Sequence, residues 1–529
     1  MSKISPPSLS RNGNVSAAAD SSCARAAIRR EAESLIEYAQ KQGGLETTFT
    51  EFERGLVNRA AALGRAVIAL FLAVSEERIS AGLTARVVRA GRVFRRAPSQ
   101  ERNLMTWFGV VRYRRAYLRE VTLSGRRSRG YHPLDAALGL LADRVSPGVL
   151  SVAVRLATRV SFSEARELLR WFLPVAPSTE VIEAALLGYG RHTTEWFEHV
   201  PAPDDDGTVL VIHVDSKGVP TAKPEELKKR RGKRSRRRKP ASPRHRGRRT
   251  RQRWTKPPKR KKGDKAKNAK MGTMVVMYTL RPHAGLLLGP LNKRVYASFS
   301  PKRHAVEIAR REATKRGFPP GTSNTIQVLT DGDPDLACYI RELFPDAIHT
   351  IDVMHVVEKL WKAGTAVHKE GTSEHRAWAE AQKDALYGGR VEDIIAELDA
   401  RLASTPKTGP GNKFRRTKLS STRGYIAKRA AMMNYKKLAE RDLELGTGAV
   451  EGAIKYVMRR RMDNGGMRWI KERAEAVLQL RCIEVNGDWE AFVARVHDNA
   501  RGEMLEQGTR FQLQQRQPTP LPHLQEEAA

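Results

Sequence analysis

Two aspartates follow apolar segments of the sequence, where carboxylates can be positioned for chemistry. Asp215 follows VLVIHV and Asp331 follows TIQVLT, and both segments have the composition of buried strands. If the two strands are neighbours, both carboxylates lie at one edge of a sheet, where such groups bind Mg²⁺ and support phosphoryl transfer. The alternative is an aspartate that only caps a turn. That alternative fits Asp333 better, because Asp333 precedes Pro334 and a predicted helix.

A third carboxylate is needed for such a site, and the candidates are Asp352, Glu358 and Glu451. Asp352 ends a further predicted strand and opens the helix VMHVVEKLWKAG, with His355 in its first turn. Glu451 opens the helix EGAIKYVMRRRM. Its alternative role is a first-turn glutamate that favours the helix dipole and pairs with Lys455. Spacing alone does not choose between Glu451 and Asp352.

The elements that would position these carboxylates alternate between strands and helices. We predict strands at 208–215, 272–280, 294–300, 325–331 and 347–352, and helices at 303–317 and 335–344. This order describes an α/β fold with a ribonuclease H-like arrangement, in which a mixed five-stranded sheet is covered by helices. In that topology the strands ending at Asp215 and Asp331 are neighbours. The pattern is then helical to about residue 500, with a polar, basic gap at 405–424.

The first 200 residues have a different pattern. Apolar residues recur at three- and four-residue steps between about 24 and 90, which predicts helices, and the segment 108–123 predicts a short hairpin or ribbon. Ser161 and Ser178 each begin a short predicted helix, and the pair is a helix-turn-helix candidate for DNA binding. A generic helical hairpin is an equally good interpretation, because the second helix carries few residues able to read base edges.

The charge indicates a polyanionic partner, and nucleic acid is the commonest one for such a chain. The 529 residues include 95 Lys and Arg against 58 Asp and Glu, a net charge of +37. The segment 228–270 holds 24 of these basic residues and one acid, and we expect it to be a disordered loop that binds DNA phosphates. A solvated linker is the alternative. The residues expected to contact DNA here are Lys228, Arg230, Arg236, Arg237, Arg248, Arg249, Lys259 and Arg260.

Other features exclude several classes of protein. The three cysteines lie far apart, which supports neither a disulfide framework nor a Cys-based zinc site, and the compartment expected is reducing. No apolar run approaches the roughly 20 residues of a membrane span, so we expect a soluble protein with no membrane partner. Residues 1–23 lack the apolar core of a secretory signal and are interpreted as a disordered tail.

Four segments resemble the ISKra family of bacterial insertion-sequence transposases. They are IHVDSKGVP, VLTDGDPDL, IDVMHVVEKLW and the long block GAVEGAIKYVMRRRMDNGGMRWIKERAEAVLQLRCIEVNGDWEAF. The resemblance spans about residues 50 to 495. It implies a DDE transposase with a ribonuclease H-like catalytic domain, in which Asp215, Asp331 and Glu451 hold two Mg²⁺ ions, with Mn²⁺ as a substitute. It also implies that Asp352 and His355 form the accessory [C/D]-x-x-H signature of related superfamilies, here in its Asp form.

The resemblance further implies the reaction. Such an enzyme binds the terminal inverted repeats of its element, cleaves phosphodiester bonds with metal-activated water, and joins the 3′-hydroxyl ends to target DNA. A homodimer or larger synaptic complex, in the bacterial cytoplasm and associated with the nucleoid, is expected. The alternatives are a nuclease of the same fold without strand transfer, and a non-catalytic or decayed DNA-binding relative. A zinc module is common near the N-terminal ribbon of such enzymes, but residues 118–132 contain no cysteine.

Further DNA contacts are expected in the last block. Arg459, Arg460, Arg468 and Trp469 are the candidates, although Trp469 fits a protein core at least as well as a stacked base. For His355 the alternative is a hydrogen-bonded histidine at a helix start.

The predicted organisation follows from these patterns. It comprises a tail at 1–23, a helical region at 24–100, a ribbon with a helix-turn-helix-like DNA-binding region at 101–200, a catalytic core at 208–360 with its basic loop, an all-helical insertion at 361–445, C-terminal catalytic helices at 446–500 carrying Glu451, and a tail at 501–529.

Overall fold

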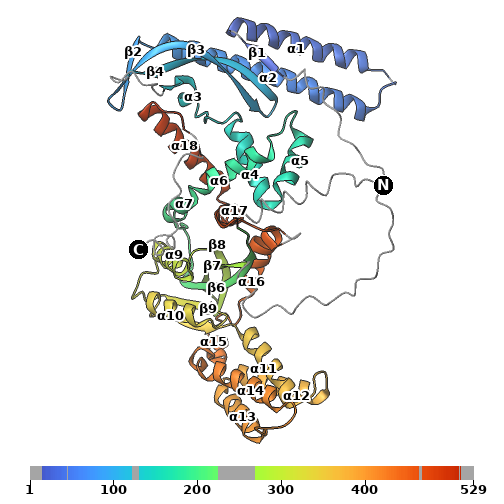
Figure 1. The fold of residues 1–529 in the computed structure, drawn as a ribbon, viewed down its shortest axis with the longest axis vertical. Helices are drawn as coiled ribbons and strands as arrows, with labels where there is room; N and C mark the ends of the chain where they lie inside the picture. The colour runs from blue at the N-terminus through green and yellow to red at the C-terminus, as the bar shows by residue number, and fades with distance from the viewer. Residues whose placement is uncertain are drawn as a thin grey trace, which may run out of the picture. The chain divides into compact units, whose positions relative to one another are not determined.

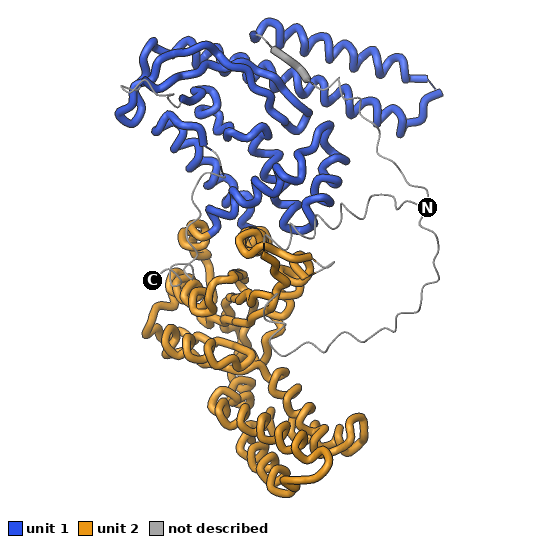
Figure 2. The backbone as a smooth tube through the Cα atoms, in the orientation of Figure 1, with its two compact units in different colours: residues 1–193, 487–519 blue, residues 194–486, 520–529 orange. Residues whose placement is uncertain are grey.

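The chain forms two compact units, which are described separately. The computed structural model describes residues 15–18, 20–44, 46–121, 130–223, 269–463, 467–511 and 513. Unit 1 comprises residues 1–193 and 487–519, and unit 2 comprises residues 194–486 and 520–529 (Figure 2). Most of the predicted basic loop, 228–268, lies outside the described residues, as do 1–14 and nearly all of the predicted C-terminal tail beyond 511.

Unit 2 contains a mixed five-stranded sheet. Its strands are β6 (Val209–Pro220), β7 (Ala269–His283), β8 (Leu286–Ser298), β9 (Thr325–Thr330) and β10 (Ile348–Ile351), in the order β10-β9-β6-β7-β8. β6 pairs antiparallel with β7 and parallel with β9, so the predicted neighbours are confirmed. The first six residues of β6 are all buried, as its apolar sequence predicts. The fold is α/β and consistent with a ribonuclease H-like arrangement.

Helices cover both faces of this sheet. α9 (Lys302–Lys315) packs against β7, and α10 (Pro334–Leu343) packs against α9. The side chain of Asp333 accepts hydrogen bonds from the backbone N–H groups of Asp335 and Leu336 at 2.9 and 3.2 Å, so its predicted capping role is confirmed. On the other face lie α16 (Gly448–Ala453), η3 (Ile454–Asp463) and α17 (Lys471–Val485) (Figure 1). η3 is a π-helix, a rare form that is frequent at functional sites.

A run of helices separates β10 from α16. The run comprises α11 (Val353–Val367), α12 (Ser373–Tyr387), α13 (Val391–Ser404), α14 (Asn412–Ala427), the short 3₁₀-helix η2 (Ala430–Met432) and α15 (Tyr435–Glu440). α14 occupies most of the predicted polar gap at 405–424, so that prediction was wrong. The reason is that only Leu419, Thr422 and Ile426 of α14 are buried, and so narrow an apolar stripe is masked by its basic residues.

Unit 1 begins with a helical hairpin and a twisted sheet. α1 (Ser21–Gln42) packs against α2 (Phe49–Ala81), and α2 packs against the long hairpin of β3 (Arg92–Thr106) and β4 (Gly109–Glu120). The short strands β1 (Val15–Ala18), β2 (Arg86–Arg89) and β5 (Gly130–Tyr131) complete the sheet. Two expected boundaries need correction. Residues 15–18 and the start of α1 fall in the predicted tail, and β2 and β3 begin inside the predicted helical region.

Helix α2 is unusually long and apolar. By length and composition alone it could cross a membrane, and it is the one described helix that could, with 28% of its apolar window buried. Core helices of soluble proteins meet the same criterion. Arg65 in the middle of α2 is 5% exposed and donates to the carbonyl of Phe108 at 2.9 Å, which ties α2 to the tip of the β3–β4 hairpin.

The remaining helices of unit 1 pack against the hairpin or against one another. They are α3 (Pro133–Ala137), α4 (Pro147–Arg159), α5 (Phe162–Phe172), α6 (Thr179–Gly190) and α18 (Trp489–Gln507), while α7 (Thr193–His199) falls mostly in unit 2. α18 was predicted among the catalytic helices, but the Trp489 indole donates to Ser151 Oγ of α4 at 3.2 Å. Within α6 only Glu180 is exposed. A DNA-reading helix would present basic or amide side chains, so α5 and α6 fit the generic helical hairpin.

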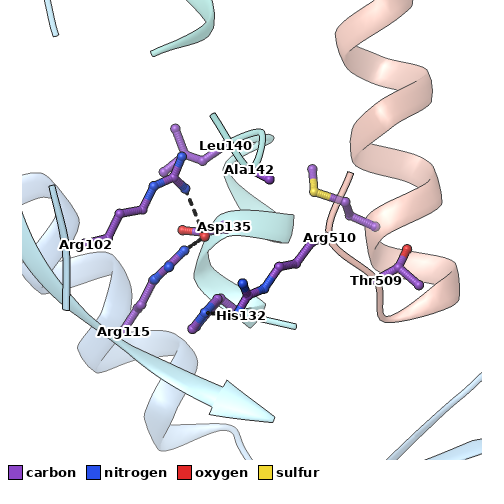
Figure 3. Close-up of a pocket in the computed structure, with 9 residues that line it drawn as sticks. Arg102, Arg115, His132, Asp135, Leu140, Ala142, Thr509 and Arg510 are labelled. Atoms are coloured by element: carbon purple, nitrogen blue, oxygen red, sulfur yellow. Dashed lines mark hydrogen bonds and ion pairs between the residues drawn. The ribbon is translucent and has the colours of Figure 1, made fainter. Parts of the chain in front are cut away.

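Asp135 is the centre of a buried ionic cluster in unit 1. Figure 3 shows it between the guanidinium groups of Arg102 and Arg115, which line a cavity of about 40 Å³. Asp135 accepts from Arg102 Nη1 at 3.0 Å and from the Tyr113 hydroxyl at 2.8 Å, and it pairs with Arg115. The side chains of Arg102 and Arg115 are 7% and 11% exposed, and Asp135 is the carboxylate that both contact directly.

We expect Asp135→Asn to destabilise unit 1 by about 3–5 kcal/mol, because it leaves two buried guanidinium groups without their counter-charge. Urea unfolding, together with hydrogen exchange of the β3 and β4 amides, measures the loss. The matched control is Glu490→Gln, which breaks the Arg155–Glu490 pair at 2.9 Å, where Glu490 is 81% exposed. That change should cost less than about 1 kcal/mol. Equal losses in the two variants would contradict the prediction.

Candidate functional site

The register of β6 and β9 determines where the two aspartates lie. Val214 in β6 is opposite Thr330 in β9, and the strands are parallel. Asp215 follows Val214 and Asp331 follows Thr330. The two aspartates therefore lie at the same end of the β6–β9 pairing. β6 continues beyond Asp215 to Pro220, pairing only with β7, so it is longer than predicted. Both aspartates are half-buried.

The pKa of Asp215 reports which groups surround its carboxyl. Burial raises this pKa most, and the nearby carboxylates of Asp331 and Glu451 raise it further. The backbone N–H of Ser216, which donates to Asp215 Oδ1 at 2.6 Å, and the charge of His355 oppose the rise. Three carboxylates from three separate elements therefore repel one another at this edge of the sheet, and His355 is the nearby group that offsets their charge.

The turn after Asp331 is held by the helical region. The Tyr425 hydroxyl donates to the carbonyl of Asp331 at 3.0 Å, and Arg429 Nε donates to the carbonyl of Gly332 at 2.9 Å. Gly332 has a φ of +85°, and a Cβ there would lie 2.4 Å from the Tyr425 hydroxyl, so this turn requires glycine. The guanidinium of Arg429 and the ammonium of Lys359 also lie over the Tyr425 ring, at 4.3 and 4.2 Å from its centroid.

Asp352 is the best-satisfied carboxylate of the group. It is 1% exposed, and it accepts from the Met354 N–H at 2.8 Å, from His355 Nδ1 at 3.1 Å and from the Thr447 hydroxyl. Burial acts to raise its pKa, but these three hydrogen bonds together lower it. Its oxygens are therefore already occupied. The geometry fits a residue that orients His355 better than one that binds a ligand directly.

The surroundings of His355 favour the protonated, positively charged form of its imidazole. The hydrogen bond to Asp352 raises the pKa of its imidazole, burial opposes the rise, and the charges of Asp352, Asp331 and Asp215 add to it. The side chain is 36% exposed, so one edge can still reach a ligand.

Glu451 is accessible, unlike Asp352. It lies in the first turn of α16 with 45% of its side chain exposed, and its Oε2 is 3.6 Å from Lys455 Nζ. This pairing is the one expected for a structural first-turn glutamate, but the pair is loose and solvated, so Glu451 can exchange it for another cation. Glu358 is on the outer side of the group, close enough for its pKa to respond to the charges of His355 and Asp352. It pairs with Lys362 at 2.9 Å on the surface of α11, with 63% of its side chain exposed.

The carboxylates suit a hard cation by chemistry, although they do not form a closed ligand set. Within the part of the chain that the structure describes, no three His, Cys, Asp or Glu side chains are close enough to hold a metal ion. The fit therefore depends on the donor type and on charge. Carboxylate oxygens are the ligands that Mg²⁺ prefers, and a cation would relieve the repulsion that raises the pKa of Asp215.

The predicted DNA contacts divide into three groups. Arg459 and Arg460 are exposed on η3, and Arg468 is half-buried. Trp469 is 6% exposed, its indole donates to the carbonyl of Met462 at 3.0 Å, and the guanidinium of Arg461 lies 4.7 Å from its ring centroid. A ring packed in this way cannot stack on a base, so the core interpretation of Trp469 replaces the DNA contact. Outside the described residues lie Lys228, Arg230, Arg236, Arg237, Arg248, Arg249, Lys259 and Arg260.

Three residues of the site were missed by the sequence analysis. They are Thr447, which binds Asp352, and Tyr425 and Arg429, which hold the turn after Asp331. None of them has a strand-end or helix-start position that would mark it. Thr447 lies between two glycines, and Tyr425 directly follows the predicted polar gap.

Comparisons with known proteins add little to this geometry. No protein-family model matches the chain, and no curated protein matches it. Among solved structures it is similar to a chain of the Drosophila P element transposase strand transfer complex, at 9% sequence identity and a TM-score of 0.20. The similarity covers 72% of this chain and 86% of that chain. A likeness of this size carries no argument about the site.

Proposed function

We propose that this chain is a DDE-type DNA transposase whose triad is Asp215, Asp331 and Glu451. The observation that supports the proposal most is the parallel register of β6 and β9, from which Asp215 and Asp331 leave at the same edge. The effect of Glu451 on the pKa of Asp215 supports its membership of the group. The motif resemblance to ISKra transposases, which covers the segments around all three residues, points to the same reaction.

Two Mg²⁺ ions, or Mn²⁺ in their place, are the cofactor proposed for these carboxylates. When bound, they supply Lewis-acid activation of an attacking oxygen and stabilisation of the leaving oxygen of a phosphodiester. Asp352 would act by holding His355, whose raised pKa favours a proton and so a positive charge beside a substrate phosphate. Tyr425 and Arg429 would fix the turn that carries Asp331. The helices between β10 and α16 would then be an insertion that supports the active site.

The proposed substrates are the terminal inverted repeats of an insertion element and a target DNA. The net charge of +37 and the basic segment 228–270 support binding to phosphates. That segment connects β6 and β7 in sequence, so it leaves the strand that carries Asp215. Bringing two element ends together calls for a homodimer or larger complex, and a bacterial cytoplasmic, nucleoid-associated location accords with the resemblance.

A strand-transfer assay tests this function. Purified protein is incubated with Mg²⁺, labelled DNA carrying candidate element ends, and plasmid target. A transposase gives cleaved ends and then labelled plasmid in which a 3′-hydroxyl end has been joined. Cleavage without joined product would instead identify a nuclease of the same fold. Salt-sensitive binding with neither product would identify a non-catalytic DNA-binding protein.

A further inference from the structure

A cavity of about 330 Å³ lies in unit 2 beside the helix that carries Glu451. This volume is within the range of small-molecule sites and large enough for one nucleotide. Val295 of β8, Val457 of η3 and Val485 of α17 form apolar parts of its wall, and Lys293 and Tyr456 lie at its edge. No acidic side chain is among the described residues that line it. An apolar wall beside a cation fits a ligand with one flat apolar part and one negative part.

Tyr456 supplies an aromatic surface to this cavity. Tyr456 is 44% exposed, and the guanidinium of Arg481 lies 4.7 Å from the centroid of the Tyr456 ring. Arg481 is 2% exposed and donates to the Tyr456 carbonyl from Nε and Nη2 at 3.3 and 3.1 Å. The ring is therefore supported from the protein side by a fixed cation. An exposed aromatic ring of this kind provides a stacking surface for any of the four bases.

The surroundings of the cavity carry charge complementary to a phosphate. Lys293 is exposed, and Lys455, Arg459 and Arg460 are exposed on the adjoining helix. The guanidinium of Arg460 lies 5.9 Å from the Tyr456 ring centroid, so one cation reaches the aromatic edge of the cavity. A ligand that stacks on Tyr456 would have its phosphate among these groups.

The polar group inside the cavity is already engaged. The Asn486 side chain accepts from the Val295 N–H at 2.8 Å and donates to the Val295 carbonyl at 3.0 Å, which continues the pairing of edge strand β8. The Asn486 amide therefore forms part of the wall, and its oxygen and nitrogen are engaged with Val295 rather than placed to read a base edge. The ligand would be held by stacking and charge, whatever its base.

The position of the cavity indicates where the ligand comes from. Gly452, one residue after Glu451, lines the cavity, and a Cβ on Gly452 would meet no atom within 4 Å. The cavity is therefore bounded in part by the same helix that carries the carboxylate proposed to act on DNA.

We propose that this cavity binds one nucleotide splayed out of the DNA strand being processed, with its base against Tyr456 and its phosphate among Lys293 and Arg460. This inference rests on the proposed function, because it takes DNA as the substrate at Glu451. Splaying one nucleotide would anchor the strand beside the carboxylates and bend its backbone away from the duplex.

Gly452→Leu is the variant that tests the cavity. The new side chain projects into open space, and leucine favours a helix more than glycine does, so the variant should fold at least as well as the wild type. The probe is duplex DNA carrying the candidate element end with single 2-aminopurine substitutions near the cleavage position. On binding, the wild type should change the fluorescence of one substitution, whose base exchanges its stack in the duplex for the Tyr456 ring, and Gly452→Leu should lose that change.

Cleavage provides the second measurement. Gly452→Leu and Tyr456→Ala should each cleave roughly 5- to 150-fold more slowly, the range given by one base stack, while Tyr456→Phe should stay close to wild type. An abasic residue at the splayed position should narrow the gap between wild type and Tyr456→Ala. The matched control is Gly502→Leu in α18, where a Cβ also meets nothing within 4 Å. It should change neither fluorescence nor cleavage.

The outcomes separate this inference from the proposed function. If the wild type cleaves and joins DNA but gives no 2-aminopurine signal, or if the signal survives in Gly452→Leu, the nucleotide site is wrong and the transposase stands. If the signal appears and is lost in Gly452→Leu while the wild type never cleaves, the site is supported and the catalytic function is wrong.

Discussion

Replacing Asp215 by asparagine should abolish Mg²⁺-dependent DNA cleavage without unfolding the protein. The change keeps the size of the side chain and removes one of three carboxylates that repel one another, so the folded state loses no favourable charge interaction with Asp331 or Glu451. The reaction, in contrast, loses a charge from the group that would hold the cation. We expect the single-turnover cleavage rate to fall by roughly 10³-fold or more, which corresponds to about 4 kcal/mol of transition-state stabilisation.

The control for this prediction is Asp333→Asn, two residues after Asp331. Asp333 caps α10 and pairs with Lys302 at 2.6 Å, and asparagine is an equally good N-cap. This variant removes a carboxylate of the same DGDPD motif but leaves the proposed triad intact, so its cleavage rate should stay within a few-fold of wild type. The unfolding midpoint and the cleavage rate should be measured for both variants. Undiminished cleavage by Asp215→Asn would refute the proposed mechanism.

The sheet of unit 2 could be predicted because its central strands β6 and β9 are largely buried. Runs such as VLVIHV and TIQVLT leave no polar face, and the helix between them has a clear apolar stripe. The adjacency of β6 and β9 then followed from topology alone. Strand ends were less predictable, because β6 extends through Ser216, Lys217 and Gly218, whose backbone pairs with β7 although their side chains are not apolar.

Contacts between distant segments could not be predicted from local patterns. Tyr425 reaches Asp331 across 94 residues, and Thr447 reaches Asp352 across 95. α18 has ordinary helical periodicity, which does not reveal that its Trp489 packs with Ser151, 338 residues earlier in the chain. The sequence around Trp469 is compatible with a core residue and with a residue that stacks on a base. Its contacts with Met462 and Arg461 in the structure distinguish the two.

The helices between β10 and α16 are linked by hydrogen bonds to the edge of the sheet that carries Asp331. Tyr425 donates to the carbonyl of Asp331, and Arg429 donates to the carbonyl of Gly332. Lys359 of α11 lies over the same Tyr425 ring. The backbone turn that carries Asp331 is therefore held by a segment almost 100 residues away in sequence. A movement of α14 relative to the sheet would therefore change the position of Asp331.

The second large effect concerns the identity of the third carboxylate. Glu451→Gln should abolish cleavage, by roughly 10³-fold or more, with almost no change in the unfolding midpoint. The reason is that its side chain is 45% exposed and makes only a loose ion pair with Lys455. Asp352→Asn should behave differently, because Asp352 is 1% exposed and accepts three hydrogen bonds. It should lower the unfolding midpoint together with the cleavage rate.

The His355 imidazole provides the measurement that separates the two roles. Its pKa is raised first by the hydrogen bond to Asp352, so Asp352→Asn should move that pKa back toward its ordinary value, whereas Glu451→Gln should leave the hydrogen bond intact. NMR titration of His355 in both variants, with the exposed Glu490→Gln of unit 1 as a control, measures the difference. Asp352 would be the third ligand if Asp352→Asn lost all cleavage at an unchanged midpoint while Glu451→Gln still cleaved. The hydrogen bonds of Asp352 favour the other result. Its Oδ1 already accepts from Met354, and its Oδ2 accepts from His355 and Thr447, so each oxygen must give up a partner before it can bind a cation, whereas Glu451 gives up only a solvated lysine.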